Sequence, residues 1–160
     1  MNRPVFLTLT MLASVLPPAA FAQDAHETAI AVVDRSGVDD NLAILLKAYA
    51  PATTTGQMTQ KNCVAAEWKA HLGIAVVAAV AKHGPAWNEA NAQILIEHMA
   101  PEQMATVLDY EPRRMQAETY GTLPPEVLQA ALDGQLQPIV QLALVDVIAY
   151  LFEHCGASTP

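Results

Sequence analysis

Apolar residues recur at helical spacing through most of the chain after residue 36. The clearest apolar stripe consists of Leu42, Leu45, Leu46 and Tyr49. These residues stand at i, i+3, i+4 and i+7, so they share one face of a helix. The preceding Ser36-Gly37-Val38-Asp39 offers a serine cap followed by acids, which the helix dipole favours in the first turn. We therefore expect a helix that begins after Ser36 and ends before Pro51.

Two longer segments are apolar enough to form the centre of a fold. The helix expected at residues 62–82 contains a run from Leu72 to Ala81 without a charged side chain, and His83-Gly84-Pro85 is typical of a helix end. Residues 137–154 form the most hydrophobic stretch beyond the N-terminal region. A helix that is apolar all round must be enclosed. We therefore expect two central helices that pack antiparallel.

Shorter helices are expected around this pair. A proline in the first turn opens each of two segments, from Pro85 to Met99 and from Pro101 to Tyr110. Weaker helical patterns follow at residues 113–120 and 122–134, whereas residues 52–61 are expected to form a polar loop. No segment of useful length alternates between apolar and polar residues as a strand does. The fold class expected is all-α, a compact helical bundle of about five to seven helices.

The N-terminus carries the three parts of a secretory signal. Arg3 supplies the positive charge, Val5 to Leu16 form the apolar segment, and Ala20-Phe21-Ala22 offers small residues for signal peptidase. We expect residues 1–22 to be a cleavable signal peptide, with cleavage between Ala22 and Gln23. The alternative is a retained N-terminal anchor. Residues 23–35 are interpreted as a tail, 36–156 as a single helical domain and 157–160 as a C-terminal tail.

An exported chain changes the interpretation of its two cysteines, Cys63 and Cys155. Outside the reducing cytosol, two cysteines that can meet are expected to form a disulfide. Because such a bond closes a loop of roughly 90 residues, it removes about 4 to 5 kcal/mol of loop entropy from the unfolded chain. The sequence contains no Cys-x-x-Cys redox motif. We interpret the pair as a structural disulfide in a periplasmic or secreted protein.

Charge excludes several classes of partner. The formal net charge of the whole chain is −8, and the signal contains only one charged side chain, Arg3. No Lys or Arg follows Met115, so the surface repels phosphate backbones and anionic membranes. Residues 137–154 are interrupted by Gln141 and Asp146 and are too short for a comfortable span. We expect no nucleic-acid partner and no membrane span in the mature chain.

Glu67 and His71 are the first candidates for chemistry. They stand four residues apart on an expected helix, so their side chains share a face and could act as a carboxylate–imidazole pair or as two metal ligands. The His-Glu-x-x-His zinc motif is absent. The alternative is a solvated pair without a functional role.

Asp146 is the third candidate. It stands between Val145 and Val147 in the most hydrophobic stretch. A buried carboxylate needs a partner or titrates at higher pH, and such groups are frequent at functional sites. The alternative is that the helix exposes one narrow strip to water at Asp146, or that Asp146 caps a neighbouring helix.

A weaker metal hypothesis involves His98, Met99 and Met104. Imidazole and thioether ligands suit copper in an oxidising compartment. However, Met99 and Met104 also fall on positions expected to face the core, where methionine commonly fills gaps. We therefore expect no resident metal, and since no phosphate-binding or other cofactor motif is present, no cofactor.

These observations leave two main functional hypotheses. The favoured one is an exported, non-enzymatic protein that binds another protein or a small apolar ligand, because the chain lacks a nucleophile motif and its cysteines are expected to be oxidised. The alternative is an exported hydrolase that uses Glu67, His71 or Asp146. The pattern leaves the identity of the partner and the oligomeric state open.

Overall fold

The structure is a computed structural model that describes the backbone of residues 18–156 and the side chains from Asp24 onward, Asp39 excepted. Most of the expected signal peptide, residues 1–17, and the expected C-terminal tail lie outside the described residues. Helices make up 89% of the described part, and no strand occurs in it. This composition confirms the all-α fold class.

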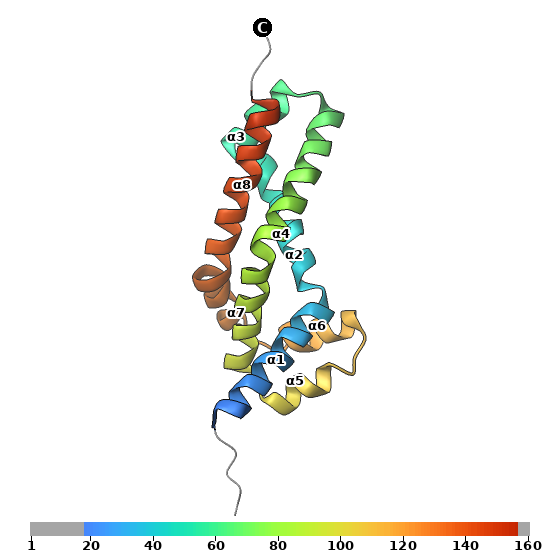
Figure 1. The fold of residues 1–160 in the computed structure, drawn as a ribbon, viewed down its shortest axis with the longest axis vertical. Coiled ribbons are helices and arrows are strands. Elements are labelled where there is room, and N and C mark those ends of the chain that lie inside the picture. Colours follow the sequence, from blue (N-terminus) through green and yellow to red (C-terminus); the bar gives the residue numbers. More distant parts are fainter. Residues whose placement is uncertain (1–17, 157–160) are drawn as a thin grey trace, which may run out of the picture.

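Two long helices form the centre of the bundle (Figure 1). They are α4 (Ala65–His98) and α8 (Gln137–Cys155), which run antiparallel and pack against each other more extensively than any other pair of elements. The Sγ atoms of Cys63 and Cys155 lie 2.04 Å apart, at disulfide-bonding distance, and connect the start of α4 to the end of α8. The expected central pair and its disulfide are confirmed.

The expected break between residues 82 and 85 does not occur. Helix α4 continues through Gly84 and Pro85 to His98, so the two helices expected there are one. Pro85 and Ala81, whose carbonyl loses its helical partner at the proline, are both exposed. Water can therefore solvate that carbonyl, and packing on both sides of the proline keeps the helix continuous.

The expected N-terminal tail is a helix, α1 (Pro18–Ser36). Its residues Ala29, Val32 and Val33 are fully buried, and it packs against α4, α5 (Pro101–Val107) and α6 (Pro112–Tyr120). Ser36 is the last residue of α1 and donates its hydroxyl to the Val33 carbonyl at 2.9 Å. The predicted serine cap is therefore wrong.

Gly37 stands between α1 and α2 (Val38–Tyr49), with a left-handed φ of 71°. This conformation is easy for glycine and unfavourable for residues with a Cβ atom. It bends the chain between the two helices without an intervening loop. Helix α2 otherwise confirms the element expected before Pro51.

The expected polar loop at residues 52–61 is also helical. After a short 3₁₀ turn, η1 (Ala50–Ala52), helix α3 (Thr54–Asn62) begins at Thr53, whose Oγ1 accepts a hydrogen bond from the Gly56 amide at 2.9 Å. A Cβ atom at Gly56 would lie 1.9 Å from the Ala50 carbonyl oxygen, so this close turn requires glycine. Thr59 is fully buried and accepts a hydrogen bond from Trp68 Nε1 at 3.1 Å, which attaches α3 to α4.

The remaining elements form a continuous helical run. Helix α7 (Pro125–Ala131) leads through a π-helical turn, η2 (Leu132–Leu136), directly into α8, so the expected end at Gly134 is absent. The helix from Pro125 to Cys155 is 31 residues long, with a mean hydropathy of 1.5 over its most apolar window. It is long and apolar enough to cross a membrane by length and composition alone, a property that core helices share. Only 28% of that window is buried inside the protein.

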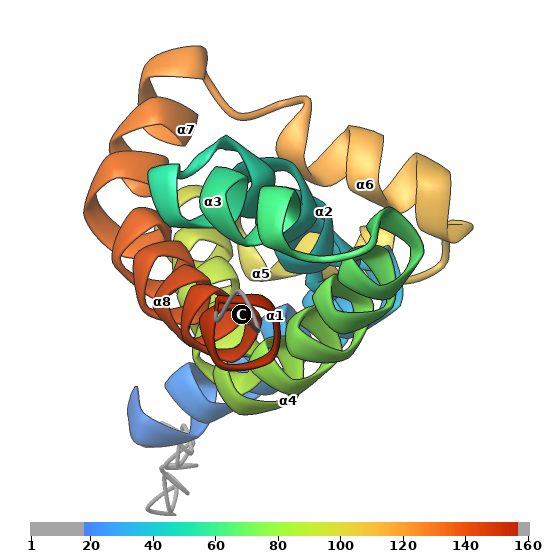
Figure 2. The same ribbon diagram turned by 90° about the horizontal axis from the view of Figure 1, so that it is seen from above.

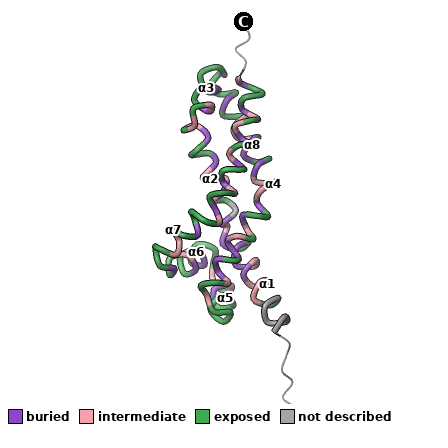
Figure 3. The backbone as a smooth tube through the Cα atoms, turned by 90° about the vertical axis from the view of Figure 1, so that its left-hand side faces the viewer, coloured by how far each residue is buried: buried purple, intermediate pink, exposed green. Residues whose placement is uncertain are grey.

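The central helices are not covered on all sides. Helices α2 and α3 lie against the α4–α8 pair, as the view along the bundle shows (Figure 2). Exposed residues, drawn green, recur along the uncovered side of both helices (Figure 3). They include apolar side chains of α4 such as Ile74, 54% exposed, and Val77, 71% exposed. The expectation that residues 72–81 are enclosed all round is therefore wrong.

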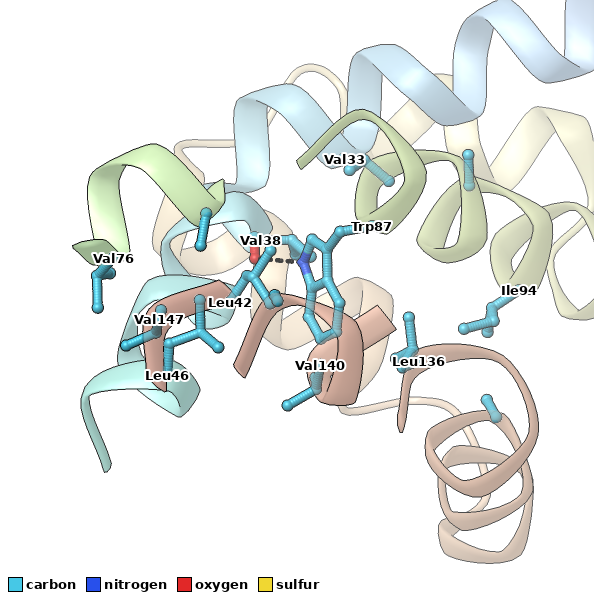
Figure 4. Close-up of a cluster of buried hydrophobic side chains, with 14 of the residues drawn as sticks. Val33, Val38, Leu42, Leu46, Val76, Trp87, Ile94, Leu136, Val140 and Val147 are labelled. Carbon is cyan, nitrogen blue, oxygen red and sulfur yellow. Dashed lines mark hydrogen bonds between the residues drawn. The ribbon is translucent and has the colours of Figure 1, made fainter. Parts of the chain in front are cut away.

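The core lies where α1, α2, α4 and α8 meet (Figure 4). Trp87 stands at its centre, 3% exposed, and its Nε1 donates a hydrogen bond to the Val38 carbonyl at 2.9 Å. Leu42, Leu46 and Val147 belong to the same cluster and are completely buried. The apolar stripe expected on α2 is thus the face that closes the core, except that Tyr49 at its end is 49% exposed.

Candidate functional site

Glu67 and His71 lie near the disulfide end of the bundle but do not act as a pair. No hydrogen bond or ion pair joins them in the described part of the chain, and Glu67 is exposed. The half-buried His71 instead faces α8, where its ring centroid lies 5.1 Å from that of His154 and 6.1 Å from that of Tyr150. Tyr150 and His154 stack on each other at 3.9 Å. The carboxylate–imidazole pair is therefore not formed.

Asp146 lies elsewhere, near the middle of the α4–α8 contact. Its Oδ2 accepts hydrogen bonds from Lys82 Nζ at 2.8 Å and from His83 Nε2 at 2.7 Å, and its side chain is 37% exposed. The hydrogen bonds from Lys82 and then His83 lower the pKa of its carboxyl group below the ordinary value. A buried, protonated acid is therefore not present. Asp146 lies on a strip that reaches water and links the two central helices.

We expect Asp146→Asn to destabilise the protein by no more than about 1 kcal/mol at pH 7, because exposed ion pairs contribute little. The folded-state pKa is depressed, so the carboxylate's contribution is present above the unfolded-state value of about 3.9 and is lost as the pH falls through the folded-state pKa. Urea unfolding of both proteins should therefore differ at pH 7 and converge under strong acid. Glu153→Gln, at an exposed acid on the same helix, is the matched control. A loss of several kcal/mol would contradict this assignment.

The three candidates do not converge on one cleft. His83 follows His71 by twelve residues along α4, which corresponds to about 18 Å of helix rise. Glu67 is exposed, His71 faces an aromatic cluster, and Asp146 accepts hydrogen bonds from Lys82 and His83. The geometry therefore gives the hydrolase hypothesis no shared site.

The structure does not support the weaker hypothesis of a metal site at His98, Met99 and Met104. Met104 is buried in the core at 1% exposure, Met99 is half-buried, and His98 is exposed at the end of α4. The described residues contain a different group of potential ligands, Cys63, His71 and Cys155, whose donor atoms all lie within 4.8 Å of one another. Sequence spacing alone could not reveal this group, because its members come from the α3–α4 joint, α4 and the end of α8.

A largely apolar cavity of about 330 Å³ opens between α2, α4, α6 and the π-helical turn. Its apolar wall includes Val38, Ile44, Leu45, Trp87, Leu132 and Leu136. Four side chains with polar groups also line it: Asn41, Asn91, Gln116 and Tyr120. This volume and composition are typical of small-molecule pockets, which are mostly apolar with a few placed polar groups.

Tyr120 gives this cavity its only strong chemical feature. Its hydroxyl oxygen is buried and has no hydrogen-bond partner among the described residues. Burial raises the pKa of the phenol well above its usual range, so the group is neutral and keeps its proton. Asn91, by contrast, donates its amide to the Trp87 carbonyl at 2.8 Å. A buried phenol that keeps a free proton can donate a hydrogen bond to an acceptor.

The mouth of the cavity is apolar too. Ile44 is 60% exposed and Leu132 is 44% exposed, and both lie at its wall. Leu45 and Leu132 also line an adjoining cavity of about 380 Å³, whose wall along α8 is more polar and includes Gln137 and Gln141. The π-helical turn places Leu132 and Leu136 at this point, and such turns in long helices are frequent at functional sites. The region is therefore the best candidate binding site.

The sequence pattern alone did not identify Tyr120. Its helix, α6, is rich in charged residues and contains only two large side chains with an apolar body, Met115 and Tyr120. These two residues were the only feature of the segment that could have indicated a buried face, because an isolated aromatic side chain in a charged helix usually packs against another element. The position of α6 against α1 and α2 depends on long-range packing, which spacing does not specify.

Comparison of the chain with models of protein families, with curated proteins and with solved structures finds no match. Functional assignment therefore rests on the chemistry of the cavity.

Proposed function

We propose that this protein is an exported, non-enzymatic binding protein that takes up a small apolar ligand with one hydrogen-bond acceptor. The observation that carries the proposal is the buried Tyr120 hydroxyl without a partner beside an apolar cavity. A buried polar group left without a partner costs about 1 to 3 kcal/mol, and native proteins leave few such groups. The hydroxyl oxygen is closed off from water in this structure, so a small movement of the cavity wall would let an acceptor on a bound ligand reach it and remove that cost.

The acceptor is expected to be neutral, such as a ketone, ester or ether oxygen. The cavity wall offers no cationic side chain, so a carboxylate would lose its hydration without gaining a counter-charge. The apolar body of the ligand would contact Trp87 and the leucines of the π-helical turn. The exposed Ile44 and Leu132 give the ligand an apolar entrance.

Export is part of the same proposal and is supported by the sequence. Cleavage after Ala22 would leave most of α1 in the mature protein. The first fully buried residue described is Ala29, so processing would retain Ala29, Val32 and Val33 in the core. The disulfide between Cys63 and Cys155 fits an oxidising compartment.

The test compares two probes of similar shape, acetophenone and ethylbenzene, of which only the first carries an acceptor. We expect acetophenone to bind the wild type about fivefold or more tightly, because one neutral hydrogen bond contributes about 1 kcal/mol. Tyr120→Phe should abolish that difference. Titration calorimetry measures both dissociation constants, and quenching of the buried Trp87 reports the same event.

Tyr110→Phe is the matched control, since Tyr110 lies outside the cavity and packs its ring under Arg114. Tyr120→Phe itself should fold with unchanged or slightly higher stability, because it removes a hydroxyl without a partner. The proposal fails if neither probe binds the wild type. It fails equally if Tyr120→Phe leaves the preference for acetophenone intact.

A further inference from the structure

The ends of the central helices bring together three side chains that are the preferred ligands of zinc. The two cysteine sulfurs and a ring nitrogen of His71 lie within 4.8 Å of one another. Tetrahedral zinc places thiolate and imidazole donors about 3.5 to 3.8 Å apart, from bonds of about 2.3 Å and 2.0 to 2.1 Å. The three donors therefore need only small displacements to share one cation once the sulfur–sulfur bond is open.

His71 is also the one member of the group whose buried polar atom lacks a partner. Its Nδ1 has no hydrogen bond in the described part of the chain. The rings of Tyr150 and His154 pack beside it and restrict its orientation. His154 meanwhile hydrogen-bonds the Tyr150 carbonyl through its own Nδ1 at 2.8 Å. A histidine ring that is positioned by its neighbours and has a nitrogen without a partner can supply that nitrogen to a metal ion.

We propose that the dithiol form of Cys63 and Cys155 binds Zn²⁺ together with His71, and that disulfide formation expels the metal. The two states use the same sulfur atoms and exclude each other, because zinc binds thiolates and a disulfide has none. The link between the central helices is thus a zinc ion bound by both cysteines in the reduced chain and a disulfide in the oxidised chain. This inference is independent of the cavity and of its ligand.

The exchange between the two states balances with a thiol reductant. A dithiol transfers two electrons and two protons to the protein disulfide, becoming a disulfide itself and leaving two protein thiols. Zinc then displaces the two thiol protons, which pass to solvent, and His71 adds its neutral nitrogen. Cys63 is half-buried while Cys155 is 3% exposed, so the reductant reaches the bond from the Cys63 side.

The test uses Co²⁺, whose thiolate charge-transfer absorption reports sulfur ligation directly, followed by displacement with Zn²⁺. The whole protein is reduced with a dithiol, freed of it without oxygen, and titrated beside an untreated sample. We expect the reduced protein to bind one Co²⁺ with this absorption and the oxidised protein to show none. The Cys63→Ala/Cys155→Ala variant should show none in either state.

His71→Ala should weaken binding by at least tenfold, whereas His98→Ala, at an exposed histidine at the other end of α4, should not change it. Equal affinity in these two variants would overturn the assignment of His71. Absence of thiolate absorption in the reduced wild type would overturn the whole proposal.

If reduction unfolds part of the chain, circular dichroism measures whether zinc restores the helical structure. A reduced chain that regains its helical signal on addition of Zn²⁺ supports the proposal, since metal binding then drives folding. A reduced chain that stays unfolded with zinc present refutes it. The same readout in Cys63→Ala/Cys155→Ala should not respond to zinc.

Discussion

Replacing Cys63 and Cys155 together by alanine is expected to lower the free energy of unfolding by about 4 to 5 kcal/mol. The disulfide closes a loop of 92 residues, and its loss returns that loop's entropy to the unfolded chain. The loss is a large part of the total, because a domain of this size is stabilised by only about 5 to 15 kcal/mol. Urea unfolding followed by circular dichroism measures the difference.

The wild type reduced in metal-free buffer distinguishes the contribution of the disulfide bond to stability from that of the cysteine side chains. It keeps both sulfur atoms and should lose nearly the same free energy as the alanine variant. Met58→Ala, at an exposed residue of the adjacent α3, is the control and should change stability by less than about 0.5 kcal/mol. A loss below about 1 kcal/mol in the cysteine variant would mean that the unfolded chain already holds its two ends together.

The disulfide and the central helices could be predicted because each follows from a local pattern. The long apolar runs mark residues 62–82 and 137–154 as helices that pack together, and the cysteines fall at ends that an antiparallel pair must join. The same reasoning failed at Gly84 and Pro85. There the cost of a proline in the helix is outweighed by packing on either side, which local propensity does not include.

Helices α1 and α3 were missed for a different physical reason. The buried positions of α3 are occupied by Gly56 and Thr59, and the apolar side chains that α1 buries are alanine and valine near its end, so neither segment shows a stripe of large apolar residues. Their burial depends on close approach to α4 and α8. Close packing of small side chains is hard to predict from the sequence, because the space beside them is filled by the backbone of the neighbouring helix and not by large apolar side chains.

On the uncovered face of α4 and α8, the sequence pattern predicted too much burial rather than too little. An apolar run such as residues 72–81 indicates that a helix is surrounded, yet Ile74 and Val77 lie in the open. The sequence specifies hydrophobicity but not how many neighbours are available to cover it. Helices α2 and α3 lie on one side of the pair, and α1 packs against the C-terminal half of α4, so Ile74 and Val77 stay uncovered nearer the start of that helix.

For the candidate sites too, the sequence indicated individual residues but not their partners. Glu67, His71 and Asp146 were selected by residue type, and the structure separates them because their partners come from other helices. Asp146 meets Lys82 and His83, and His71 meets the cysteines and the rings of α8. Pairings across α4 and α8 decide the chemistry of each side chain, and those pairings depend on the relative rotation of two helices.

Trp87→Ala is expected to cost about 3 to 5 kcal/mol of stability, since it removes the largest side chain from the centre of the core. It also removes the hydrogen bond from Nε1 to the Val38 carbonyl, which connects α4 to the start of α2. Equilibrium unfolding in urea measures the loss, and the melting temperature should fall with it.

Two further variants divide that cost between packing and hydrogen bonding. Trp87→Phe keeps an aromatic ring in the core but lacks the Nε1 donor, so the missing hydrogen bond alone should account for about 1 kcal/mol of its loss. Val77→Ala, at a residue of the same helix that is 71% exposed, should have almost no effect. If Trp87→Ala and Val77→Ala cost the same, then α2 does not close the core over α4, and the cavity beside Tyr120 loses its wall.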